Sequence, residues 1–173
     1  MLRNFVNIVG IDDPSSFPLI TAANPNTQYT VQETVTIPAA KPDAEQIDSV
    51  LVQATIIDAK VIITPVGLKT VIEGELKQKV IYTANLPDQP VHSAEYLFPF
   101  CTFIEMPLII PLGGTVETVL QAAGLTLDTV LVGNAKVLIE DMTVELLDLR
   151  TINKCTIVFI WTSINPALVP LLK

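Results

Sequence analysis

The sequence predicts an all-β protein, either an antiparallel β-sandwich or a flattened barrel, with long hairpins and irregular terminal arms. Half of the 173 residues are hydrophobic, and valine and isoleucine, which favour strands, are frequent among them. Several long segments alternate between apolar and polar residues, and short turns separate them. We expect one β domain over residues 29–164, preceded by an arm of residues 1–28 and followed by a tail of residues 165–173.

The first strand is expected over residues 29–37, YTVQETVTI, and Pro38 ends it. Residues 41–50 then place a proline and acidic residues where the start of a helix tolerates them, which predicts one short helical turn. A second strand is expected over residues 52–64, with a polar interruption at Asp58.

The longest predicted hairpin covers residues 67–107. From Leu68 to Tyr82 the even positions are mostly apolar, and the odd positions include five charged residues: Lys69, Glu73, Glu75, Lys77 and Lys79. This alternation predicts one covered face and one solvated face with charges of both signs. Residues 85–90, NLPDQP, suit a turn, and residues 91–106 form the returning strand.

A second long hairpin is predicted after the loop at Gly113 and Gly114. Its strands are expected within residues 130–149 and 151–164. In the last strand one face carries Cys155, Ile157, Phe159 and Trp161, and the other carries Lys154, Thr156 and Thr162.

Three segments carry a resemblance to a known family: VTIPAAKPDAEQID, AKVIITPVGLKTVIEGELKQKVIYTA and QPVHSAEYLFPFCTFIEMP. In this order they resemble the SPOCS domain, which endospore-forming bacteria use in proteins that build the spore coat and exosporium. The resemblance covers residues 31–107, and it is looser as far as Ser163. It implies a protein made in the cytoplasm of the mother cell and exposed on the spore surface when that cell lyses.

The N-terminal arm is richer in apolar residues than a free, solvated tail needs to be. It either packs on its own domain or adds as a strand to a neighbouring subunit, where backbone hydrogen bonds give affinity. The candidate subunit interface consists of six apolar residues: Leu2, Phe5, Val6, Ile8, Val9 and Ile11. An arm that covers the sheet edge of another copy repeats head to tail, which generates a filament or lattice.

The net charge of −8 comes from eighteen acidic and ten basic residues. No basic patch stands out, so neither a nucleic acid nor an anionic membrane surface is an expected partner. The N-terminus lacks the continuous apolar core and cleavage site of a secretory signal, and no apolar run is long enough for membrane insertion. We therefore expect a protein made in the cytoplasm without a signal peptide.

No group of residues predicts catalysis, metal binding or cofactor binding. Ser93 and Glu95 fall on the strand face opposite to the single histidine, His92, so they form no catalytic set with it. The resemblance implies a structural hydrogen bond for His92. We therefore expect a protein that is not an enzyme.

Two further groups of side chains leave alternatives open. Tyr96, Phe98 and Phe100 alternate onto one face, which suits a sheet core or a platform for sugar or peptide. Cys101 and Cys155 lie in strand-like runs and are either buried thiols or partners in a disulfide or intermolecular link.

Taken with the resemblance, these features predict a structural protein of the spore outer layers (coat, exosporium or surface fibre) that self-assembles by β-strand addition through its terminal arms. The apolar, proline-broken tail of residues 165–173 is either packed on its own domain or in contact with a neighbour. Copies of the chain itself would be the partners of the protein, together with other spore coat proteins. The alternatives are an adaptor that recruits another coat protein without polymerising and a carbohydrate-binding module.

Overall fold

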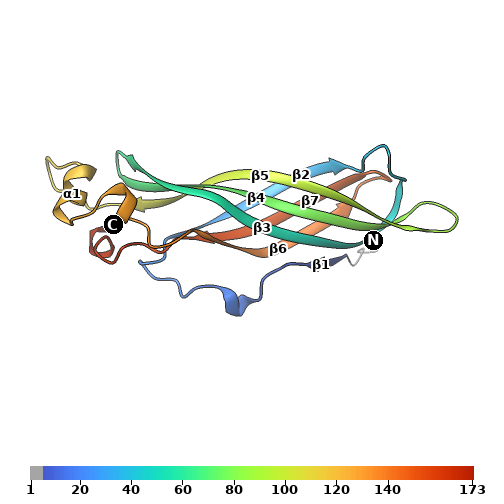
Figure 1. Ribbon diagram of the computed structural model, residues 1–173, viewed down its shortest axis with the longest axis horizontal. Coiled ribbons are helices and arrows are strands. Elements are labelled where there is room, and N and C mark those ends of the chain that lie inside the picture. The colour runs from blue at the N-terminus through green and yellow to red at the C-terminus, as the bar shows by residue number, and fades with distance from the viewer. Residues whose placement is uncertain (1–5) are drawn as a thin grey trace.

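Two β-sheets packed face to face form the computed structural model, which describes residues 6–173 (Figure 1). The first sheet has the strand order β1-β3-β4-β5 and the second has the order β2-β7-β6. The strands are β1 (Asn7–Val9), β2 (Asn26–Thr36), β3 (Ala44–Thr64), β4 (Gly67–Ala84), β5 (Val91–Pro107), β6 (Lys136–Leu146) and β7 (Thr151–Trp161). Both sheets are open, so the predicted sandwich is confirmed and the barrel alternative is not.

The strands β3, β4 and β5 form an antiparallel meander that is the larger part of the first sheet. Every even position of β4 from Leu68 to Tyr82 is buried, as the alternation predicts. The odd positions carry exposed ion pairs with β5, Lys69 with Glu105 at 3.3 Å and Lys79 with Glu95 at 3.8 Å. Such pairs add little stability, so the buried face of β4 provides most of the packing.

The helical turn predicted over residues 41–50 is wrong, because β3 begins at Ala44 and continues to Thr64. In this part of β3 the buried residues are Ala44, Ile47 and Val50, three positions apart. Two register shifts, between Ala44 and Gln46 and between Ile47 and Ser49, interrupt the pairing with β4. Each bulge inserts one residue into the strand, so the inward spacing becomes three and imitates a helix. A third shift lies at Asp58, the predicted interruption.

The second sheet is built on β7, which pairs antiparallel with β2 on one side and with β6 on the other. The β6–β7 hairpin confirms the prediction for residues 130–164, although β6 begins only at Lys136. The inward face of β7 is the one that carries Lys154 and Thr156, together with Val158 and Ile160. A core of apolar residues from both sheets, including Ile72, Leu76 and Ile139, fills the space between them.

One end of the sandwich is closed by a short helix that the sequence analysis missed, α1 (Val116–Ala122). Thr115 caps it, and Val116, Val119 and Leu120 lie at the spacing of a buried helix face. They join a second apolar cluster that includes the fully buried Leu168. The C-terminal tail, which includes a short 3₁₀ turn at Val169–Leu171, is therefore packed on its own domain. Further 3₁₀ turns, at Pro14–Ser16 and Leu127–Thr129, lie in connections between strands.

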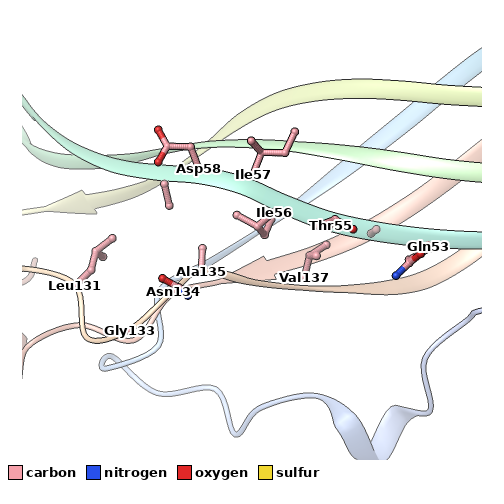
Figure 2. A pocket seen from close by; sticks show the side chains of 12 residues that line it. Gln53, Thr55, Ile56, Ile57, Asp58, Leu131, Gly133, Asn134, Ala135 and Val137 are labelled. Carbon is pink, nitrogen blue, oxygen red and sulfur yellow. The ribbon is translucent and has the colours of Figure 1, made fainter.

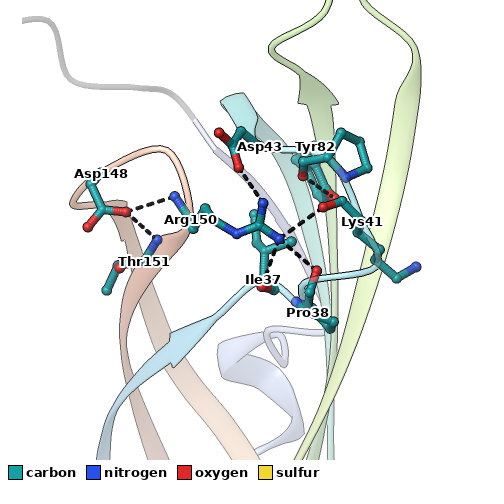
Figure 3. Close-up of polar contacts among 9 residues, drawn as sticks. Ile37, Pro38, Lys41, Asp43, Tyr82, Asp148, Arg150 and Thr151 are labelled. Atoms are coloured by element: carbon teal, nitrogen blue, oxygen red, sulfur yellow. Dashed lines mark hydrogen bonds and ion pairs between the residues drawn. The ribbon is translucent and has the colours of Figure 1, made fainter.

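At the opposite end, Arg150 fastens the crossover from β2 to β3 (Figure 3). Its guanidinium pairs with the carboxylate of Asp43 and donates to the carbonyl oxygens of Pro38 at 2.7 Å, Lys41 at 2.9 Å and Ile37 at 3.3 Å. The backbone N–H groups of Arg150 and Thr151 donate to Asp148, which lowers the pKa of that carboxyl. Arg150 thus joins the two sheets where the chain passes between them.

Candidate assembly interface

One side of the sandwich is formed by the outer edge of β3 and the outer edge of β6. The strand β1 covers β3 only at Ser49, Val50 and Leu51. From Val52 to Thr64 the outer edge of β3 has no strand partner among residues 6–173. Unpaired edges present backbone donors and acceptors to any extended chain. This edge can therefore accept an added strand, as can the outer edges of β2, β5 and β6 in the described fold.

A groove of about 550 Å³ lies along this edge, between β3 and the chain that leads into β6 (Figure 2). Its walls are residues 53–59 of β3 and, on the other side, Leu131, Gly133, Asn134, Ala135 and Val137. Ile56 lies on the side of β3 toward β6, whereas Ile57 points away and is 61% exposed. The groove combines free backbone edge with small apolar contacts, as a site for an extended peptide requires.

The N-terminal arm covers the neighbouring part of the same edge. Ile8 pairs in parallel with Val50 of β3, and the side chains of Val6 and Ile8 are half-buried against the core. Farther along the arm, Asp12 makes two hydrogen bonds with the backbone of Ile139 in β6. The N–H of Asp12 donates to the Ile139 carbonyl at 3.0 Å, and the carboxylate of Asp12 accepts from the Ile139 N–H at 2.7 Å. The arm therefore connects the β3 edge of one sheet to the β6 edge of the other.

Gly10 determines how closely the arm approaches β3. Its φ of +116° is a conformation that residues with a side chain rarely adopt, and an added Cβ would lie 2.0 Å from the carbonyl oxygen of Val52. After Asp12 the arm leaves the edge, and Phe17 packs edge-on against Phe159 with ring centroids 5.5 Å apart. The segment between β1 and β2 is drawn below the two sheets in Figure 1, and it leads into β2.

The six candidate interface residues are thus placed in different ways. Val6 and Ile8 contact their own domain, whereas Val9 is 48% exposed and Ile11 is 40% exposed. Leu2 and Phe5 lie outside the described residues. The sequence analysis did not identify β3 as an edge strand, although the charged residues Asp58 and Lys60 within an apolar strand are typical of edges.

The two cysteines lie on opposite sides of the molecule. Cys101 is exposed on the outer face of β5, so the prediction of a buried thiol is wrong for it. Cys155 is half-buried on the outer face of β7 in the other sheet. Because packed sheets lie about 10 Å apart, a disulfide between these two residues would exceed the usual Cα separation.

Three aromatic residues of β5 pack into the core, whereas Phe103 is 47% exposed. Phe100 is buried, while Tyr96 and Phe98 are half-buried against the main apolar cluster. This confirms the sheet-core interpretation and leaves no exposed three-ring platform for a sugar. His92 stacks on Tyr82, with ring centroids 6.0 Å apart and an interplanar angle of 28°, so its observed contact is stacking rather than the hydrogen bond that was expected.

Within residues 6–173, no helix combines the length and the hydrophobicity needed to cross a membrane. The same residues contain no group of three or more His, Cys, Asp or Glu side chains arranged to hold a metal ion.

Comparison with known proteins identifies one family. Residues 43–147 match the family described as SipL, SPOCS domain, a segment that runs from the start of β3 past the end of β6. No curated protein and no solved structure gives a significant match to the chain. Because the matched segment covers more than half of the 173 residues, this protein belongs to the SPOCS domain family, a family of sporulation-related proteins.

Proposed function

We propose that this protein is a structural, non-enzymatic component of the outer layers of the bacterial spore, and that it polymerises by adding its N-terminal arm to the β3 edge of a neighbouring copy. Family membership supports the link to sporulation. The observation that carries the assembly role is the short parallel pairing of β1 with β3 at Ser49–Leu51, on an outer edge that has no other strand partner as far as Thr64 among residues 6–173. The protein would be made in the mother-cell cytoplasm and reach the coat, exosporium or spore surface.

The arm is suited to exchange between copies. Its strand pairing with β3 extends over only three residues, and an irregular segment from Gly10 to Pro25 separates it from β2. An arm that pairs with β3 of a second copy would make the same backbone and side-chain contacts as it makes with β3 of its own chain. Such an exchange of identical elements is domain swapping. Because the donor and the acceptor are different surfaces, the contact is heterologous and can propagate without closing.

The test compares the full-length chain with a variant that lacks residues 1–12, by negative-stain electron microscopy and light scattering over a series of protein concentrations. We expect filaments or sheets from the full-length protein and small particles from the variant. The deletion should end at residue 12, because the carbonyl groups of Ala23 and Pro25 accept hydrogen bonds from Ile164 and Thr162, and β2 begins at Asn26.

A point variant tests the same contact with the chain length unchanged. Gly10→Val should remove assembly as the deletion does, because its side chain would overlap the Val52 carbonyl. Leu19→Ala, which changes an exposed residue of the same arm, serves as the control and should assemble normally. Polymers formed by the shortened chain would refute the role of the arm, and small particles from every variant would instead support an adaptor that binds another coat protein.

A further inference from the structure

The middle of the sandwich contains four polar or aromatic side chains that the proposed function does not use. Glu33 of β2 and Lys154 of β7 are directly opposed in the second sheet. Gln78 of β4 and Tyr96 of β5 are directly opposed in the first sheet. These two pairs meet between the sheets, because Gln78 hydrogen-bonds to Glu33 and the Lys154 Nζ lies 4.4 Å from the centroid of the Tyr96 ring.

One carboxylate oxygen of Glu33 contacts both nitrogen-bearing side chains. The Nε2 of Gln78 donates to Glu33 Oε2 at 2.5 Å. The Nζ of Lys154 lies 3.5 Å from the same oxygen. The Lys154 amine and the nitrogen of the Gln78 carboxamide therefore both lie within 3.5 Å of one oxygen, and both side chains are fully buried.

This cluster does not resemble a well-satisfied buried ion pair. Neither the Lys154 Nζ nor the Gln78 Oε1 has a hydrogen-bond partner among the described residues. A buried ammonium carries three donors and is stable only when acceptors surround them. Burial lowers the pKa of Lys154, and the nearby charge of Glu33 opposes this only in part. Both observations make it easier for Lys154 to lose a proton, and the neutral amine is the nucleophilic form of lysine.

We propose that Lys154 and Gln78 react within the folded chain to form an isopeptide bond between Nζ and Cδ, with Glu33 as the group that carries the protons. The bond would join β7 to β4 and so connect the two sheets covalently. It is a single self-modification, distinct from the turnover of a substrate, and it does not depend on the proposed assembly.

The atoms and charges of this reaction balance without an oxidant, a reductant or a second molecule. The Glu33 carboxylate takes a proton from the Lys154 ammonium, and the amine attacks Cδ of Gln78, placing negative charge on Oε1. Glu33 then gives the proton to Nε2, the Cδ–Nε2 bond breaks and ammonia leaves. The carboxylate accepts the remaining proton from Nζ and passes it to the ammonia. The products are a secondary amide and one ammonium ion, and Glu33 is regenerated.

The fold supplies the conditions that this chemistry needs. Packing holds the nucleophile, the acyl group and the proton carrier together, which removes most of the entropic barrier to their reaction. The site lies in a core in which Lys154, Gln78 and Thr156 are all completely buried and the Glu33 side chain is 9% exposed, which limits competition by water as a nucleophile. Glu33 is within hydrogen-bonding distance of the leaving nitrogen, as a general acid must be.

The experiment is an intact-mass measurement of the purified full-length chain after denaturation, followed by digestion and fragmentation. We expect a mass lower than that of the sequence by one ammonia, and a branched peptide that contains both Lys154 and Gln78. The proposal is overturned by a chain of full mass, by loss of one water with a link between Lys154 and Glu33, or by loss of ammonia that maps to an asparagine.

Three variants separate the chemistry from the fold. Glu33→Gln keeps the shape of the side chain but cannot carry protons, so it should retain the full mass, as should Lys154→Met. Lys136→Met, at an exposed position of β6, should still lose ammonia. Circular dichroism of each variant before denaturation shows whether it is folded, and a folded Glu33→Gln that still forms the bond would overturn the role of Glu33. Because the mass is read on denatured single chains, this result is independent of whether the protein polymerises.

Discussion

Gly74→Val is expected to lower the free energy of unfolding by about 3 kcal/mol or more, because the added side chain must displace backbone as well as side-chain atoms. Gly74 lies in the middle of β4, opposite Phe100 of β5 and Ile56 of β3. A Cβ at this position would lie 2.4 Å from a ring carbon of Phe100 and 2.7 Å from the carbonyl oxygen of Thr55. A glycine within a strand marks such a close approach.

Guanidinium unfolding followed by circular dichroism measures this loss. Glu73→Val is the matched control, since it introduces the same side chain one residue away at an exposed position of the same strand and should leave stability nearly unchanged. Similar unfolding midpoints for the two variants would contradict this prediction. They would show that the Phe100 ring and the backbone of β3 at Thr55 move aside at little cost in stability.

Arg150→Met should destabilise the domain by about 2–3 kcal/mol, since hydrogen bonds to a charged group contribute more than neutral ones. The variant keeps the aliphatic length but removes every guanidinium contact, among them the ion pair with Asp43 and the bonds to the Pro38 and Lys41 carbonyls. These contacts hold the crossover between the sheets (Figure 3). Their loss therefore also frees the start of β3.

Chemical unfolding gives the change in stability, and hydrogen exchange at Ala44 reports on the crossover, because its N–H donates to the carbonyl of Leu149 beside Arg150. Arg150→Lys should lower the free energy of unfolding by most of the amount expected for Arg150→Met, because an ammonium cannot reach several acceptors in one plane. If lysine restored the wild-type midpoint, the charge alone and not the forked geometry would be responsible.

The long strands could be predicted from the sequence because their signal is local. In β4 the alternation runs without interruption from Leu68 to Tyr82, and each even residue is buried. The start of β3 was misjudged because its bulges change the inward spacing from two to three. The helix α1 was missed although its cap Thr115 and its apolar residues at helical spacing were present, because the strand pattern on both sides dominated the interpretation.

The functional features depend on pairing between distant segments, which no local pattern encodes. The sheet order leaves the outer edge of β3 without a strand partner beyond Leu51 within residues 6–173. Tertiary contacts bring β1 back to this edge in parallel at Ser49–Leu51. Lys154 shows the same limit. Its alternation with Cys155 and Ile157 was correct, but the face that contains Lys154 and Thr156 is the one turned toward the other sheet. The burial of Lys154 on this face is explained by Glu33, whose carboxylate pairs with Lys154 and accepts a hydrogen bond from Gln78 of the other sheet.

The docking of β1 on its own β3 makes each chain a competitor for its own acceptor edge. A short tethered segment has an effective concentration on the order of millimolar at its home site, so a partner's arm displaces it only when chains are crowded to a comparable local density. Under the proposed exchange, dilute chains in the cytoplasm would remain self-capped, and chains gathered on a surface would link to one another. The arm would thus set a threshold that confines polymer growth to the place where the protein accumulates.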